Sequence, residues 1–372
     1  MHPTHSCMEA EMATAIRAQR YATHYNYERM RNWMMVKNSL AALLLAAMAL
    51  GSAHAQTAAP LKLVKTVTLP GYTGDFDHFA IDRARGRILV AAEDHATLEI
   101  FDLKTGNHLR TIPGFGAPHT TLVRPGSPIV LVTDSGPQMT AVLDANTYQR
   151  KGSVPLIPGA DSAGYDPVAN IWYIITGGKD VDMTTASIEA INPDTGKELG
   201  KFTFNDNHVE AIALAKNDPR IFINLSQTNK IAVLDRKTMK EIAEWPVPPA
   251  KANAMVQFDE AAHRLYVVCR DPGMVAVMNS DTGAVVSTAP APLRADDSML
   301  DLATHRLYVP GGEGYTGIYD TSDPNSIKQV AKVPTASGAK TGILIPDMHE
   351  LILAASPGDT KNIAKIMTFK IE

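Results

Sequence analysis

One short segment recurs seven times along this chain at an almost constant interval, and this repeat limits the possible folds more than any other feature. Each copy is an apolar run of β-prone residues that follows a polar turn. The copies begin at Arg87, Pro128, Ile171, Arg220, Arg264, Arg306 and Glu350, at spacings of 41, 43, 49, 44, 42 and 44 residues. A fixed period of this length indicates a repeat architecture in which each unit covers the apolar face of its neighbour.

A second segment recurs in phase with the first, namely a strand-like run that ends in Asp or Asn before a turn. Its six copies end at Asp102, Asp144, Asn192, Asp235, Asn279 and Asp320. Thr-Gly follows closely at 105–106, 195–196 and 282–283, where a hydroxyl group and a glycine suit a tight turn. Two markers in register indicate that one structural unit is repeated through the whole region.

Each unit contains four short strand-like runs separated by turn residues, and no helical stretch. In the first unit we expect strands at His78–Asp82, Arg87–Ala92, Leu98–Asp102 and His108–Ile112. Four strands in about 40–45 residues are typical of one propeller blade. The sequence therefore predicts an all-β fold, a seven-bladed β-propeller of four-stranded blades over residues 61–372.

The two ends of the repeat region complement each other. The last unit has three strands, at Thr341–Ile345, Glu350–Ala355 and Lys365–Ile371, while Leu61–Leu69 is strand-like and precedes the first blade without a partner. We predict that this N-terminal strand completes the last blade as its outer strand. Such closure joins the two ends of the ring and removes two exposed sheet edges.

The segment Arg264–Thr288 (RLYVVCRDPGMVAVMNSDTGAVVST) resembles the YVTN-type β-propeller repeat, whose pattern is an R-x-Y-V strand, a polar turn, a V-x-V-[IL]-[DN] strand and T-G. Here Val268-Cys269 replaces the Thr-Asn of the name motif. The resemblance extends over residues 61–372 and implies a periplasmic or secreted seven-bladed propeller. It implies no single activity, because such propellers include binding proteins, quinoprotein-like subunits and hydrolase-like relatives.

The segment before the repeats carries a predicted export signal. Leu40–Leu50 is an apolar run of eleven residues, too short for a membrane span of about 20 residues. Basic residues precede it and Ala53-His54-Ala55 follows it, so we expect a cleaved secretory signal peptide over residues 30–55. No cysteine lies directly after the run, so a lipid anchor at this segment is excluded. The expected mature protein is periplasmic or secreted, and no later segment is apolar for long enough to span a membrane.

The remaining N-terminal segments are assigned by their relation to this signal. Residues 1–29 are expected to be an over-long start or a disordered extension, and residues 56–60 a linker. The candidate start positions are Met1, Met30, Met34 and Met35.

Composition excludes several classes of protein. A net charge of −4 excludes a nucleic-acid binder that works by bulk charge. Two cysteines in 372 residues exclude a disulfide framework and a multi-cysteine metal site. Cys269 lies in an apolar run, so we expect it to be a buried, unreactive thiol.

Antiparallel strand order predicts where chemistry can occur. The start of each innermost strand and the loop between the second and third strands lie on one face, at the channel mouth. The residues nine positions before each repeat marker are His78, His119, Ser162, Met255, Asp297 and Thr341, and the longer turn of the fourth blade moves the equivalent position to between His208 and Ala211. Neighbouring positions and the second-to-third-strand loops add Asp77, Asp161, Asn253, Asp296, Lys340, Glu93, Asp180 and Arg270.

From these positions we predict a ligand-binding set at the channel mouth. Its members are His78, His119, His208, Glu210, Asp297, Asn253, Lys340 and Arg270. Imidazole and carboxylate groups together suit a divalent metal ion, for which His78, His119 and His208 would be the ligands. A solvated channel or a small-ligand pocket is the other interpretation. Because a wet channel mouth buries little apolar surface, we expect replacement of its histidines to change stability little. His263, His305 and His349 share one turn position on the opposite face and are expected to be turn structure.

Three functions remain compatible with the sequence. The first is an exported propeller that binds a small ligand or a protein partner at the channel-mouth face without catalysis. The second is a metal-assisted lyase or hydrolase that uses the same face, with Glu210 or Asp297 as the base. The third is a quinoprotein-like redox subunit, although no sequence motif indicates the cofactor that it would need.

Overall fold

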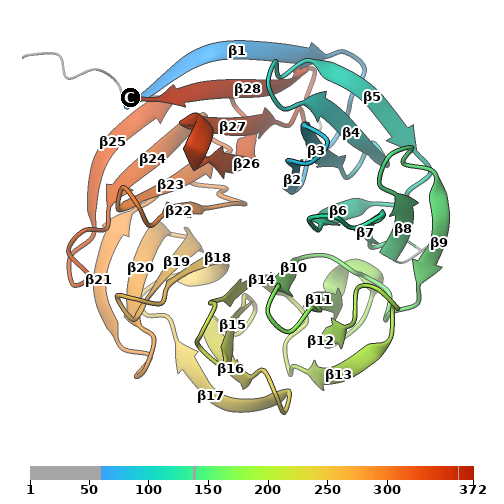
Figure 1. Cartoon of the computed structure of the whole chain (residues 1–372). Coiled ribbons are helices and arrows are strands. Elements are labelled where there is room, and N and C mark those ends of the chain that lie inside the picture. Colours follow the sequence, from blue (N-terminus) through green and yellow to red (C-terminus); the bar gives the residue numbers. More distant parts are fainter. Residues whose placement is uncertain (1–59, 137–139, 359) are drawn as a thin grey trace, which may run out of the picture. The chain divides into compact units, whose positions relative to one another are not determined.

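The structure, a computed structural model, describes residues 60–136, 140–358 and 360–372. The predicted signal peptide, the segment before it and most of the linker lie outside the described residues. The described part of the chain forms seven four-stranded antiparallel sheets arranged in a ring (Figure 1). The prediction of an all-β, seven-bladed propeller is confirmed. No helix in these residues is long and apolar enough to cross a membrane.

Each of the first six blades contains four strands in the order of the sequence. The strands of the first three blades are β2 (Phe79–Asp82), β3 (Arg87–Ala92), β4 (Thr97–Asp102) and β5 (His108–Pro113); β6 (Pro118–Val123), β7 (Ile129–Asp134), β8 (Thr140–Asp144) and β9 (Arg150–Val154); β10 (Ala163–Asp166), β11 (Ile171–Gly177), β12 (Ala186–Ile191) and β13 (Glu198–Thr203). The strands of the next three are β14 (Val209–Leu214), β15 (Arg220–Leu225), β16 (Lys230–Asp235) and β17 (Lys240–Pro246); β18 (Lys251–Asp259), β19 (Arg264–Asp271), β20 (Gly273–Asn279) and β21 (Val285–Pro290); β22 (Met299–Asp301), β23 (Arg306–Gly311), β24 (Tyr315–Asp320) and β25 (Lys328–Pro334). Two short 3₁₀ turns, η1 (Lys179–Val181) and η2 (Pro346–Met348), lie in connecting segments.

The last blade is built from both ends of the propeller. It contains β26 (Ala339–Ile345), β27 (Glu350–Ala355), β28 (Ala364–Ile371) and, as its outer strand, β1 (Leu61–Leu69). β1 pairs antiparallel with β28 from one end to the other, and Figure 1 shows it outside that strand. The predicted closure by the N-terminal strand is therefore confirmed.

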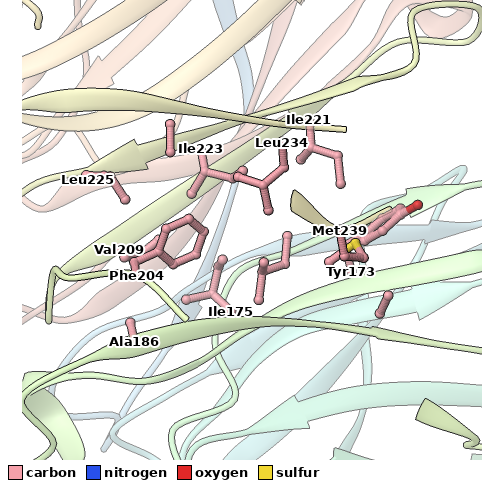
Figure 2. Packing of buried hydrophobic residues seen from close by; sticks show 13 residues of the cluster. Tyr173, Ile175, Ala186, Phe204, Val209, Ile221, Ile223, Leu225, Leu234 and Met239 are labelled. Atoms are coloured by element: carbon pink, nitrogen blue, oxygen red, sulfur yellow. The ribbon is translucent and has the colours of Figure 1, made fainter. Parts of the chain in front are cut away.

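Burial explains why the second and third strands of each blade are apolar runs. In β3, five of the six residues are buried, because neighbouring blades cover both faces of the strand. The outer strands alternate or are largely exposed, as in β17. Figure 2 shows one such layer, in which Phe204 and Ile175 of the third blade pack against Ile223 of the fourth. Each fully buried side chain of this size contributes about 1.5–3 kcal/mol to folding.

The second sequence marker forms a side-chain-capped turn. Asp102 Oδ1 accepts hydrogen bonds from the backbone N–H and the hydroxyl group of Thr105, both at 2.8 Å. The same contact to a threonine N–H recurs from Asp144, Asn192, Asp235 and Asn279. Gly106 has a φ of 62°, in the left-handed region that the turn requires. The Asp/Asn-to-Thr-Gly pattern therefore ends the third strand and starts the fourth.

The repeated histidines and the lone described cysteine have structural positions. His263, His305 and His349 have φ values of 55°, 53° and 50°, in turns that precede the second strand of their blades. They are turn residues, as expected. Cys269 is fully buried in a layer between blades, and burial raises its pKa to about 12. This agrees with an unreactive core thiol.

Candidate functional site

The innermost strands of the blades bring ionisable residues together at one end of the channel. A cavity of about 240 Å³ lies there, and six blades contribute to its wall. Its ionisable lining residues are Asp77, His78, Glu93, His119, Lys179, Asp161, Asp180, His208, Glu210, Arg270 and Asp296. A second cavity of about 430 Å³ follows the innermost strands and shares His78, Ser162 and Met255 with the first. The first cavity is a polar mouth at one end of the central channel, and the second continues along the innermost strands as far as Pro346.

His119 is the centre of one half of this mouth. Its Nδ1 lies 2.6 Å from Asp77 Oδ2 and 3.4 Å from Asp161 Oδ1, and its Nε2 lies 3.0 Å from the hydroxyl group of Ser135. His119 and Asp77 are only 7% and 8% exposed. Both ring nitrogens therefore already have protein partners in a buried setting.

His78 connects this half to the other side of the ring. Its Nε2 lies 3.5 Å from Asp77 Oδ1 and its Nδ1 lies 3.8 Å from Asp297 Oδ2. Asp297 also accepts hydrogen bonds from the backbone N–H groups of Ser298, at 2.9 Å, and Gly342, at 3.3 Å. His78 thus lies between two carboxylates from opposite ends of the repeat region.

A chain of ion pairs crosses the other half of the mouth. His208 pairs with Glu210, whose Oε1 lies 3.0 Å from the Arg270 guanidinium, and Arg270 pairs in turn with Asp296. Lys340 Nζ continues the chain, because it lies 2.7 Å from Asp296 and 2.7 Å from Asp75. Consecutive blades are thereby joined by alternating charges, so the side chains at the mouth are held in place.

Several groups of the mouth have pKa values that favour the charged form. For His78, burial is outweighed by the charges of Asp77 and Asp297, which raise the pKa. Burial opposes the ionisation of Asp77, but the charge of His78 and the hydrogen bond to His119 outweigh it and lower the Asp77 pKa to about 2. Burial likewise opposes the ionisation of Glu210, but His208 and Arg270 lower its pKa to about 2. The carboxylates around His119 overcome its burial and raise its pKa to about 10. Asp77, Glu210 and His119 are therefore charged at neutral pH.

Two other carboxyl groups of the cavity behave in the opposite way. Burial, together with the charges of Asp77 and Asp161, raises the pKa of Glu93 to about 8 against the attraction of His119. Burial also raises the pKa of Asp161 to about 6. The cavity therefore holds a protonated carboxyl group beside ionised ones at neutral pH.

The structure brings together most of the predicted ligand-binding set. His78, His119, His208, Glu210 and Arg270 line the first cavity, Asp297 lines the second, and Lys340 contacts the lining residue Asp296.

Asn253 is placed differently from the prediction. Its side chain is fully buried, and its Nδ2 donates to Asn224 Oδ1 at 2.7 Å and to the Lys230 carbonyl group at 2.9 Å. A register shift in β18 between Asn253 and Met255 separates the two side chains, and it is Met255 that lines the cavities. Asn253 therefore belongs to the interior between blades, not to the mouth.

The structure also changes the set of side chains that could hold a metal ion. Within the described residues, the metal-capable cluster consists of Asp77, Glu93 and His119, whose ligand atoms lie within 4.8 Å of one another. His208 is paired with Glu210 and lies outside this cluster. A metal ion at His119 would have to displace Asp77 or Ser135 from a ring nitrogen, so the observed contacts fit a metal poorly.

Glu93 and Asp161 are two of the ionisable cavity residues that the predicted ligand-binding set omits, together with Asp77, Lys179, Asp180 and Asp296. Both were recognised in the sequence as neighbours of the channel mouth, Glu93 through its loop between the second and third strands of the first blade. No local pattern separates them from the other polar residues of those loops, because their importance comes from contacts with the next blade.

No family model matches the chain, and no curated protein matches it. Solved structures do resemble it in fold. A chain from "Crystal Structure of Mitotic Checkpoint Complex" superposes with a TM-score of 0.65 at 12% identity, covering 83% of this chain and 92% of that one. A chain from "Structure of U3-55K" superposes with a TM-score of 0.63 at 10% identity, covering 81% and 98%. At such identities the likeness supports the propeller fold alone.

Proposed function

We propose that this protein is an exported β-propeller of the YVTN type that binds a small polar molecule in its channel-mouth cavity. The observation that carries the proposal is the cavity of about 240 Å³ whose wall is formed by ionisable side chains from six blades. Concave sites with a few convergent polar groups are the usual places for small ligands. Export is proposed from the apolar run Leu40–Leu50 and the small-residue site after it.

The ion pairs around the mouth favour a binding function. Arg270 is held by Glu210 and Asp296, and His119 by Asp77 and Ser135, so these side chains need little further ordering when a ligand arrives. Ordering a flexible side chain on binding costs about 0.5–1.5 kcal/mol, so a prearranged wall increases affinity.

The contacts of the two candidate bases give less support to catalysis. Glu210 contacts both His208 and Arg270, and its pKa is lowered to about 2, far from the pH at which a general base works best. Asp297 accepts two backbone hydrogen bonds and faces His78. We therefore favour ligand binding without catalysis over a lyase or hydrolase.

A thermal-shift screen of the full chain against small polar metabolites, followed by calorimetry, tests this proposal. We expect some compounds to raise Tm, and we expect Asp161→Asn and His208→Gln to weaken their binding. The matched controls are His263→Asn and Asp347→Asn, which change polar side chains on the opposite face. Asparagine suits the left-handed backbone at His263.

Two results would contradict the proposal. One is that no compound in the screen changes Tm. The other is that Asp161→Asn and His208→Gln bind the identified compounds as tightly as the two control variants do.

A further inference from the structure

Two basic side chains of the mouth, Arg270 and Lys340, each already contact two carboxylates, whereas the third, Lys179, is half exposed and lies 3.9 Å from Asp180. Arg270 donates to Glu210, to Asp296 and to the carbonyl group of Ala295. Lys340 lies between Asp75 and Asp296, at 2.7 Å from each. The charges of Arg270 and Lys340 are therefore neutralised by protein carboxylates, and neither side chain is free to bind an anionic ligand.

The opposite side of the cavity contains a carboxyl group, that of Glu93, which has no ion-pair partner among the described residues. The carboxyl groups of Asp77, Glu93 and Asp161 surround the imidazole of His119, and the imidazole of His78 lies 3.5 Å from Asp77. Asp77 takes the short contact to Nδ1, at 2.6 Å, while Asp161 remains at 3.4 Å with a side chain that is 38% exposed. Within the described part of the chain, no basic side chain forms an ion pair with Glu93. Glu93 therefore lines the cavity without an ion-pair partner in the residues that the structure describes, and Asp161 has only the longer contact to His119.

We infer that the cavity binds a small organic cation, a protonated amine, whose ammonium group lies between Glu93 and Asp161. The inference rests on the proposed function and names the ligand class for the same cavity. An ammonium group donates several hydrogen bonds to carboxylates and can replace the missing counter-charge there.

An amine fits this cavity better than a metal ion does. Both nitrogens of His119 are engaged, by Asp77 and by Ser135, so the imidazole has no free lone pair for a metal. The cavity of about 240 Å³ is also much larger than a single ion, which needs roughly the space of one or two water molecules. A divalent ion shares the positive charge, so the experiment includes it as a separate arm.

The surroundings of Glu93 predict that amine binding depends on pH. His119, Asp77, Asp161 and Asp94 are the charged groups that act on it, and burial with the neighbouring acids raises its pKa to about 8. An ammonium group beside Glu93 stabilises the ionised form. Amine binding should therefore release a proton near pH 7, and affinity should increase between pH 6 and pH 8.5.

Three four-carbon molecules of matched length test the charge preference by calorimetry on the full chain. These are 1,4-diaminobutane, 1,4-butanediol and succinate, and MnCl₂ and ZnCl₂ form the metal arm. We expect the diamine to bind at least about tenfold more tightly than the diol or succinate, because buried charge complementarity discriminates strongly. Glu93→Gln should weaken diamine binding at least about tenfold and abolish the proton release, whereas Asp347→Asn should change neither.

The results that would contradict the amine inference differ from those that would contradict ligand binding in the cavity. Binding of succinate or the diol in preference to the diamine would overturn the amine inference while leaving the cavity a ligand site. Binding of Mn²⁺ or Zn²⁺ that excludes the diamine would replace the amine with a metal. Failure of the diamine to bind, when the metabolite screen finds other ligands, would also overturn the inference. A screen without ligands would instead contradict the proposed function.

Discussion

At the scale of single residues, burial changes what is expected of the histidines at the mouth. The sequence-based expectation was that replacing them would leave stability nearly unchanged, because the mouth would be wet. His119 is instead 7% exposed and pairs with Asp77, which is 8% exposed. Removing one partner of such a pair leaves an uncompensated buried charge.

We therefore predict that His119→Ala lowers the free energy of unfolding by about 3 kcal/mol. The double variant Asp77→Asn/His119→Ala should lose less than the sum of the two single variants, because it removes both members of the pair. Urea denaturation of the three variants measures this, with His263→Asn as the control. Strict additivity would show that the two side chains do not interact.

The raised pKa of Glu93 predicts how stability depends on pH. Its pKa is about 8 in the folded protein against an ordinary value of 4.5, so the folded state binds more protons than the unfolded state between these values. Stability from this group is fully present below pH 4.5 and is lost as pH rises through 8. Glu93→Gln should flatten the fall of Tm between pH 5 and pH 8. An equally steep fall in wild type and in Glu93→Gln would contradict the prediction.

At the scale of the structural element, the capped turn explains why an Asp or Asn recurs at the end of the third strand. The side chain of this residue caps the turn that follows. The side-chain oxygen of Asp102 accepts the N–H of Thr105 at 2.8 Å, and asparagine does the same at positions 192 and 279. Aspartate and asparagine are thus interchangeable in this turn, because only a side-chain oxygen at this distance from the backbone is required.

We predict that Asp102→Ala lowers the free energy of unfolding, because the turn loses the side-chain oxygen that accepts the N–H and hydroxyl group of Thr105. Asp102→Asn is the matched control and should lose less, because it keeps the acceptor and loses only the charge that faces Arg87 at 3.3 Å. Chemical denaturation of the two variants measures the difference. Equal losses would assign the effect to the Arg87 pair and not to the turn.

At the scale of the whole propeller, stability depends on the seam between the first and last strands. β1 and β28 pair over their full length, and the backbones of Gly74 and Gly358 exchange hydrogen bonds of 3.2 and 3.1 Å beside that seam. Without β1, the last blade keeps three strands and exposes the edge of β28.

A chain that begins at residue 70 should therefore unfold at a much lower temperature than the full chain and should associate through the exposed edge. The control is a chain that begins at Pro60, which retains β1 and should melt close to the full chain. Calorimetry and light scattering of the two truncated proteins provide the comparison. Equal melting temperatures would mean that the seam does not hold the ring together.

Local chemistry allowed the sequence to determine the architecture. Blade number and strand limits depend on apolar runs and on turn residues such as Asp102 and Thr105, which act within one unit. Closure was inferred from the unpaired strand Leu61–Leu69 and the three-stranded last unit. Strand direction also predicted which positions of each blade lie at the channel mouth.

Only the tertiary structure decided which of those residues act together. Register shifts occur near the start of several innermost strands, between Pro118 and Thr121, between Asn253 and Met255, and between Ala339 and Thr341. A shift of one residue reverses the face on which a side chain lies, and this is why Asn253 lies in the blade interior. The contacts that define the cavity join residues about one repeat apart, such as Asp77 and His119, and their distance depends on how neighbouring blades pack, which no local pattern encodes.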